Sequence, residues 1–260
     1  MQVGRGESAG WTRRSLLTGA VAASVVALGA ACAPPAARRA SPPVPRTALV
    51  YRGPAGCDGC AETLAERLGS GGSGLDVSFI GPGQDVEATP EALDGASLFV
   101  QPGGGDDIDD AASHFSQGFS RALRRFVHDG GRYLGVCMGA YLAGSDGFGL
   151  LSTSIEGAVG TPRFPVADSG EHLVEVAWNG TKRWTFFQEG ALLPARGAEV
   201  CARYCAGGTA AALYRVGKGR VGLIGPHPEA DQTWFDEAGL SDPDGDDWRF
   251  ARPLVDRLLA

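Results

Sequence analysis

The chain contains 260 residues, is 43% hydrophobic and 20% charged, and carries a formal net charge of −7. This length suits one globular domain with an extension, and it allows a sizeable core. The acidic balance and the absence of a basic stripe argue against nucleic-acid binding. No glycine-rich phosphate loop with a following Lys occurs in the sequence, so we expect no nucleotide cofactor.

The N-terminal segment, residues 1–32, is predicted to be an export signal. It contains the twin-arginine pattern Thr12-Arg13-Arg14-Ser15-Leu16-Leu17, followed by an apolar run that is too short to span a membrane. Leu28-Gly29-Ala30-Ala31-Cys32 resembles a bacterial lipobox, although its aliphatic residue lies four positions before Cys32 instead of three. We therefore expect an exported protein that is lipid-anchored through Cys32 on the outer face of the cell membrane. Plain cleavage without lipidation is the alternative.

The rest of the chain divides into a linker and one domain. Residues 33–46 are rich in Pro, Ala and Arg and are expected to form a semi-extended tether. Residues 47–260 form the predicted domain, which begins with alternating strands and helices. The strands are expected at Thr47–Tyr51, Leu75–Ile80 and Ser97–Gln101, and the helices at Cys57–Leu68 and Asp110–His128. This alternation predicts a doubly wound, flavodoxin-like α/β fold with a mainly parallel sheet and helices on both faces.

A Gly-x-Cys-x-Gly turn follows the next predicted strand, Arg132–Leu134. A strand that enters such a turn and leaves as a helix has the layout of a nucleophile elbow, in which strained backbone exposes the central side chain. Here that side chain is Cys137, and the positive end of the following helix favours its thiolate. The alternative is a buried structural cysteine.

The second half of the domain changes to an antiparallel pattern. Asn179-Gly180 predicts a hairpin, and further turns at Gly207-Gly208 and Gly217-Lys218-Gly219 predict a β meander. The last strand of the meander ends in His227-Pro228-Glu229. A His held by a carboxylate is the base that a Cys nucleophile requires, so we predict a triad of Cys137, His227 and Glu229. A final helix is expected at Arg252–Leu259, after an acidic loop at Asp242–Asp247 that is expected to be solvated surface.

Together, the elbow cysteine and the His-Pro-Glu motif resemble the class I glutamine amidotransferase-like superfamily. The motifs Gly-x-Cys-x-Gly-Ala-Tyr and Gln101-Pro102-Gly103-Gly104-Gly105 look most like the N-terminal domain of eukaryotic biotin–protein ligases. No ligase half is present, so biotin transfer is not implied. Glutaminases of this superfamily usually carry a Gln four residues after the nucleophile, where it holds glutamine. This chain has Tyr141 there, as a candidate substrate-binding residue, so glutamine hydrolysis is not implied.

The triple glycine after Gln101 is a candidate oxyanion hole. In a doubly wound sheet, the ends of the strands form the rim of the ligand crevice, and both this loop and Cys137 follow strands. We expect the N–H groups of Gly103 or Gly104, with that of Met138, to face the developing oxyanion, as the resemblance also implies. The alternative is a plain turn.

The cysteines give a further prediction. Apart from Cys32 there are five, an odd number in an oxidising compartment, so we expect Cys137 to remain the free thiol. For the others we favour disulfides from the Cys57/Cys60 loop to Cys201/Cys205, while a local Cys57–Cys60 bridge stays open. Redox chemistry at Cys57-Asp58-Gly59-Cys60, or a soft metal bound by the cysteine pairs, are the rival interpretations. We favour disulfides and expect no metal and no cofactor.

These features predict an exported cysteine-dependent hydrolase or amide/acyl transferase that acts on an unidentified small or peptide-like substrate. The alternative is a non-catalytic extracytoplasmic lipoprotein that binds a ligand or metal on the same scaffold. We expect contact with the membrane only through the lipid on Cys32.

Overall fold

The computed structural model describes residues 46–70 and 74–260. The predicted signal peptide, Cys32 and the linker up to residue 45 lie outside these residues. Arg46, which we expected to end the linker, already belongs to the first strand.

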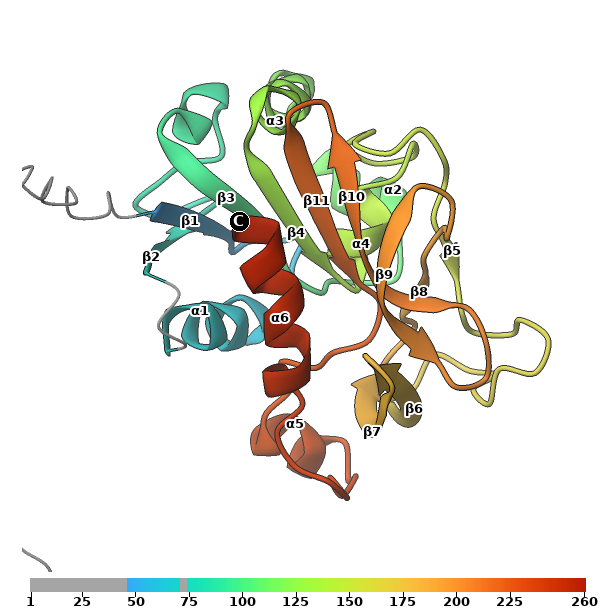
Figure 1. Cartoon of the computed structure of the whole chain (residues 1–260). Coiled ribbons are helices and arrows are strands. Elements are labelled where there is room, and N and C mark those ends of the chain that lie inside the picture. The colour runs from blue at the N-terminus through green and yellow to red at the C-terminus, as the bar shows by residue number, and fades with distance from the viewer. Residues whose placement is uncertain (1–45, 71–73) are drawn as a thin grey trace, which may run out of the picture. The chain divides into compact units, whose positions relative to one another are not determined.

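A nine-stranded mixed sheet is the framework of the domain (Figure 1). Its order is β2-β1-β3-β4-β11-β10-β9-β6-β7. The parallel half consists of β1 (Arg46–Tyr51), β2 (Leu75–Ile80), β3 (Ala96–Gln101), β4 (Arg132–Val136) and β11 (Gly219–Ile224). The antiparallel half consists of β6 (His172–Trp178), β7 (Thr181–Phe187), β9 (Ala198–Tyr204) and β10 (Thr209–Val216). A small pair, β5 (Glu156–Gly157) and β8 (Ala191–Leu192), forms a second sheet.

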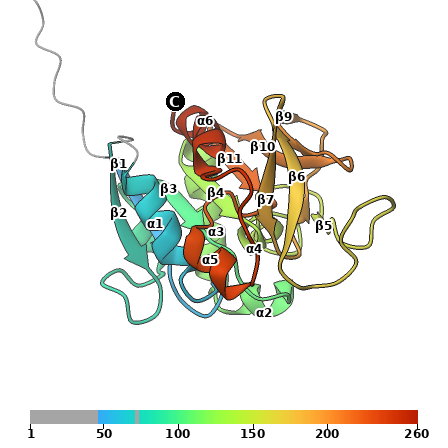
Figure 2. The ribbon, with the colours of Figure 1, turned by 90° about the horizontal axis from the view of Figure 1, so that it is seen from below.

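Helices cover both faces of the sheet. They are α1 (Cys60–Ser70), η1 (Pro90–Leu93, a 3-10 helix), α2 (Ile108–Ser113), α3 (Gln117–Asp129), α4 (Met138–Leu142), α5 (Gln232–Glu237) and α6 (Trp248–Leu259). Figure 1 shows α6 in front of β4 and β11, with α2 and α4 behind the strands, while Figure 2 places β6 and β7 at the opposite end of the sheet from β2.

Alternating side chains along the strands build two separate cores. In β1, Ala48 and Val50 pack in the cluster that contains buried residues of α1 and α6. Leu49 and Tyr51 point to the other face and join the cluster formed with α3 and α4. This period of two is the physical reason that one central strand can serve two helical layers. The predicted flavodoxin-like α/β fold, with the antiparallel meander before His227, is confirmed.

Three helix predictions need correction. The final helix begins at Trp248 instead of the expected Arg252. The helix expected over Asp110–His128 is two helices, because the backbone of Ser116 is extended and its hydroxyl accepts from the N–H of Phe119, which caps α3. The apolar stripe continues through the break, so hydrophobic periodicity alone did not reveal it. The first helix begins at Cys60, not at Cys57, since Gly59 adopts a left-handed φ of 78° just before it.

Candidate active site

The turn at Cys137 has the strained geometry of a nucleophile elbow. Cys137 joins β4 to α4 with φ 50° and ψ −110°, a left-handed φ that non-glycine residues rarely adopt. Glycine is required on both sides of it. A Cβ on Gly135 would lie 2.2 Å from the carbonyl oxygen of Gly139, and a Cβ on Gly139 would lie 2.1 Å from that of Gln101. The two glycines therefore let strand and helix approach closely enough to form the turn.

The predicted base is buried beside the elbow. His227 follows β11, and its N–H donates to the carbonyl of Phe186 at 2.8 Å. Its Nδ1 lies 2.8 Å from Oε1 of Glu229, whose side chain is fully buried. The second oxygen of Glu229 has no hydrogen-bond partner among the described residues. The carboxylate is therefore directed to the imidazole alone, an arrangement that fixes the orientation of the ring.

The charge state of His227 depends on its two partners. Burial alone lowers the pKa of the imidazolium, but the charges of Cys137 and Glu229, with the hydrogen bonds that these side chains make to the ring, outweigh it and raise the pKa to about 10. An imidazolium at His227 would stabilise a thiolate on its neighbour, and the thiolate is the reactive form of a cysteine nucleophile.

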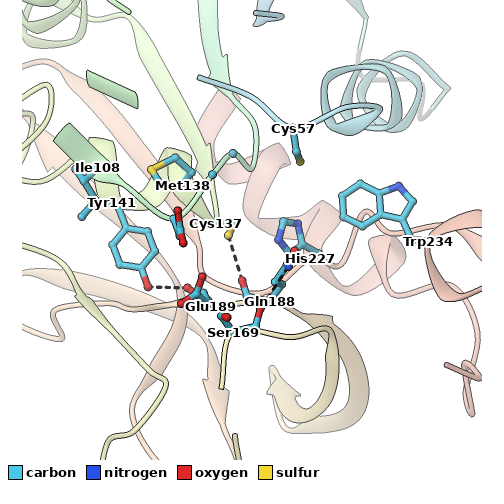
Figure 3. A pocket seen from close by; sticks show the side chains of 13 residues that line it. Cys57, Ile108, Cys137, Met138, Tyr141, Ser169, Gln188, Glu189, His227 and Trp234 are labelled. Atoms are coloured by element: carbon cyan, nitrogen blue, oxygen red, sulfur yellow. Dashed lines mark hydrogen bonds between the residues drawn. The ribbon is translucent and has the colours of Figure 1, made fainter. Parts of the chain in front are cut away.

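Cys137 and His227 open into a cavity of about 370 Å³ (Figure 3). The predicted residues that line it are Cys137, His227, Tyr141, Gly104, Met138 and Cys57. The side chain of Cys137 is 8% exposed, and its Sγ lies 3.5 Å from the carbonyl oxygen of Gln188. The cavity therefore contains both the nucleophile and its base, with enough room for a small ligand.

Of the two glycines predicted for the oxyanion hole, only Gly104 lines the cavity. A Cβ on Gly104 would meet the Met138 side chain and a backbone oxygen. The N–H groups of Gly104 and Met138 donate to no acceptor within the described residues. Gly103 lies farther back, where a Cβ would lie 2.8 Å from the His227 ring, and its carbonyl accepts from the N–H of Cys57.

Tyr141 occupies one wall of the cavity. Its hydroxyl donates to the carbonyl of Glu189 at 2.7 Å (Figure 3). Burial, together with the negative charges of Cys137, Glu189 and Glu156, raises the pKa of this phenol well above its usual value. Tyr141 is therefore a neutral group that ties α4 to the loop after β7.

The disulfide pairing differs from the one that we favoured. Cys57 and Cys60 are bonded to each other, whereas Cys137, Cys201 and Cys205 are free. The predicted bridges from Cys57/Cys60 to Cys201/Cys205 are therefore wrong, and so is the prediction that Cys137 is the single free thiol. In the sheet, β1 and β9 are five strand intervals apart, which is roughly 24 Å. The ends of the two strands lie on the same side of the sheet, but they are too far apart for a disulfide between the loops that follow them.

The acidic loop was also misjudged. Asp247 is buried, and its Oδ1 lies 2.8 Å from Nε of the buried Arg183 on β7. Burial raises the pKa of Asp247 even though Arg183 and Thr185 hydrogen-bond to it. This part of the loop therefore anchors the start of α6 to the sheet.

Sequence reasoning missed half of the cavity wall. The missed residues are Gly105, Asp106, Ile108, Ser169, Gln188, Glu189 and Trp234. Gln188 and Glu189 come directly after the strand of the recognised hairpin, so the strand end was visible, but its position at the far edge of the sheet was not. The centroid of the Trp234 ring lies 5.2 Å from that of His227. No motif indicates that contact.

Within residues 46–70 and 74–260, no group of three or more His, Cys, Asp or Glu side chains is suited to hold a metal. In the same ranges, no helix is both long and apolar enough to cross a membrane.

Solved structures of other proteins share this fold. PurLQS from Thermotoga maritima superposes with a TM-score of 0.55 at 17% identity, over 83% of this chain and 100% of that one. A glutamine amidotransferase from the same organism gives 0.50 at 15% identity, over 83% and 99%. Such identities establish the fold alone.

The sequence itself gives the more particular relationship. Residues 49–163 match the family described as "Biotin-protein ligase, N terminal". The resemblance to that domain is thus confirmed. The matched range includes Cys137 and Tyr141 and ends before His227 and Glu229.

Proposed function

We propose that the protein is a cysteine-dependent hydrolase or amide/acyl transferase that works through Cys137, His227 and Glu229. The observation that carries this proposal is the strained cysteine beside a buried histidine whose Nδ1 is held 2.8 Å from a buried carboxylate. The relationship to amidotransferase-like proteins supports acyl chemistry on a C–N bond.

In the proposed reaction, the Cys137 thiolate adds to the carbonyl carbon of the substrate. The N–H groups of Gly104 and Met138 would stabilise the oxyanion. When the tetrahedral intermediate collapses, the C–N bond breaks, and His227 gives its proton to the departing amine. A thioester on Cys137 remains. His227, now neutral, would take a proton from water or from an acceptor amine as that nucleophile releases the acyl group and regenerates the thiolate.

Alkylation of Cys137 by a chloroacetamide probe tests the proposal. Peptide mass spectrometry of the full chain reports each cysteine separately. We expect Cys137 to react faster than the exposed Cys205 at neutral pH, and His227→Gln to slow Cys137 by about 10²-fold or more. Cys205→Ser is the matched control and should leave the Cys137 rate unchanged. A Cys137 that reacts no faster than Cys205 would contradict the proposal.

One observation supports a second candidate, a binding protein without turnover. Tyr141 stands where glutaminases of the superfamily carry Gln, and its hydroxyl is already bonded to Glu189 across the cavity. An inert Cys137, combined with saturable ligand protection against heat, would favour this candidate.

We further propose that the protein acts outside the cytoplasm, attached by lipid at Cys32. The twin-arginine pattern and the lipobox-like Leu28-Gly29-Ala30-Ala31-Cys32 support this location, and the Cys57–Cys60 disulfide agrees with an oxidising compartment.

A further inference from the structure

The active-site cavity is lined by acidic side chains. Glu189 and Asp106 both line it, and Asp106 also lines an adjoining hollow together with Asp107, Asp109 and Asp146. Among the described residues of these two linings, His227 is the only basic side chain, and its charge is already matched by Cys137 and Glu229. A ligand that enters therefore meets a negative field.

The two cavity carboxylates are not engaged by the protein. The side-chain carboxylates of Glu189 and Asp106 neither accept a hydrogen bond from, nor form an ion pair with, another described residue. Burial and the nearby charge of Asp106 raise the pKa of Glu189. Burial and the charge of Asp106 therefore destabilise the carboxylate form of Glu189, and a cation placed between the two carboxylates would stabilise it.

The position of Glu189 places its charge close to the reacting atoms. Glu189 follows Gln188, whose carbonyl lies 3.5 Å from Sγ of Cys137, and its own carbonyl holds the Tyr141 hydroxyl (Figure 3). The Glu189 backbone is in the left-handed region, with φ 46°, an uncommon conformation for this residue type. The turn therefore keeps an acidic side chain on the wall of the Cys137 pocket.

Resting on the proposed function, we propose that the substrate is a cationic amide, with an ammonium or guanidinium group near the carbonyl that Cys137 attacks. Glu189 and Asp106 would bind the cationic group. A substrate with a carboxylate or phosphate at this position is disfavoured by the same charges.

Thiol reagents that differ in charge test this selectivity on the full chain. The 2-aminoethyl, 2-sulfonatoethyl and methyl methanethiosulfonates each transfer a thioalkyl group to a thiolate and release methanesulfinate. Rates are read at Cys137 and at Cys205 by peptide mass spectrometry. We expect the cation-to-anion rate ratio at Cys137 to exceed that at Cys205 by about tenfold or more.

Three variants separate the local charges from net charge. Glu189→Gln and Asp106→Asn should each lower the cation-to-anion rate ratio at Cys137 about threefold to tenfold. Asp76→Asn makes the same charge change at the opposite edge of the sheet, near the start of β2, and should leave the ratio unchanged. If Glu189→Gln fails to fold, Asp106→Asn tests the proposal instead, because Asp106 is exposed.

The outcomes also separate this inference from the proposed function. Cys137 could react fast with the neutral reagent, in a His227-dependent way, while its cation-to-anion rate ratio equals that of Cys205. That result would overturn the proposal of a cationic substrate and leave the proposed nucleophile intact. Slow reaction with every reagent overturns the nucleophile itself. As an independent readout, a carboxamide with an ammonium group should protect Cys137 from the neutral reagent better than size-matched neutral or carboxylate amides. Equal protection by all three would overturn the inference.

Discussion

The Cys137 side chain strongly affects the protonation of His227. Cys137→Ala removes the charge and the hydrogen bond that favour the imidazolium, while burial, which lowers the pKa, remains. We expect the pKa of His227 to fall from about 10 towards or below its usual 6.5. An NMR titration of the imidazole protons measures it, with Cys205→Ser as the control. An unchanged pKa would show that Cys137 does not interact with the ring.

The same shift links stability to pH. Because the folded pKa of His227 lies above its unfolded value, the stabilisation is complete below about pH 6.5 and is lost as pH rises towards about 10. Urea unfolding between pH 6 and 10 should show this decline, and His227→Gln should lose that component. If the free energy of unfolding fell equally with pH in the wild-type protein and in His227→Gln, the result would argue against the raised pKa of His227.

Residues of the site were predictable where local sequence carries the chemistry. Cys137 is marked by its flanking glycines, and Glu229 by its place two residues after His227. Glu189 and Asp106 were not predictable, because they come from loops that meet only when the sheet forms. Gly103 follows β3 as expected but does not line the cavity, because it packs against the His227 ring and the Cys57–Cys60 sulfurs.

The packing of α4 against β3 and β4 depends on the absence of a side chain at Gly139. In Gly139→Ala the new Cβ would lie 2.1 Å from the carbonyl oxygen of Gln101, so the backbone must shift. We expect a loss of about 1–3 kcal/mol in the free energy of unfolding and slower labelling of Cys137. Gly105→Ala, with open space at its Cβ, is the matched control for urea denaturation. Equal stability of the two variants would contradict the close approach.

The loop that leads into α1 is fixed by the Cys57–Cys60 bridge. Because this bridge spans only three positions, the entropy model gives about 2 kcal/mol of stabilisation. The double variant Cys57→Ser/Cys60→Ser should lose that amount in urea unfolding and leave Cys137 able to react. Thiol counting in denaturant, with Cys32 replaced, should give three before reduction and five after. One thiol before reduction would show a second disulfide and would contradict free thiols at Cys201 and Cys205.

At the level of elements, strands were more predictable than helix ends. Alternating apolar residues predict the bounds of β1, β2 and β3 within one residue, and Asn179-Gly180 marks the turn of the β6–β7 hairpin. The break before α3 was not predicted, because a capping serine interrupts the helix without interrupting its apolar stripe. The disulfide error has a similar cause. Strand direction follows from the turns, but lateral order in the sheet depends on packing that no local pattern encodes.

On the scale of the whole molecule, the parallel half of the sheet contributes the nucleophile and the base, and the antiparallel half closes the cavity. Cys137 follows β4 and His227 follows β11, two adjacent parallel strands. Gln188 and Glu189 follow β7, at the far edge of the sheet. The long meander between Cys137 and His227 therefore brings Glu189 to the cavity, whereas Asp106 comes from the loop after β3, in the parallel half.

The sequence predicts that the whole molecule is exported through a twin-arginine signal and anchored by lipid at Cys32. We expect Arg13→Lys/Arg14→Lys to retain the protein in the cytoplasm, because the substitution keeps the charge but removes the arginine pair that the export pathway reads. Arg5→Lys, outside the motif, is the matched control. Protease added to intact cells or spheroplasts should digest only exported protein. Cys32→Ser should still be exported but leave the membrane fraction, since one anchoring group is lost. A double-lysine variant exported as well as the Arg5→Lys control would contradict the twin-arginine assignment, and a Cys32→Ser variant that stays on the membrane would contradict the lipid anchor.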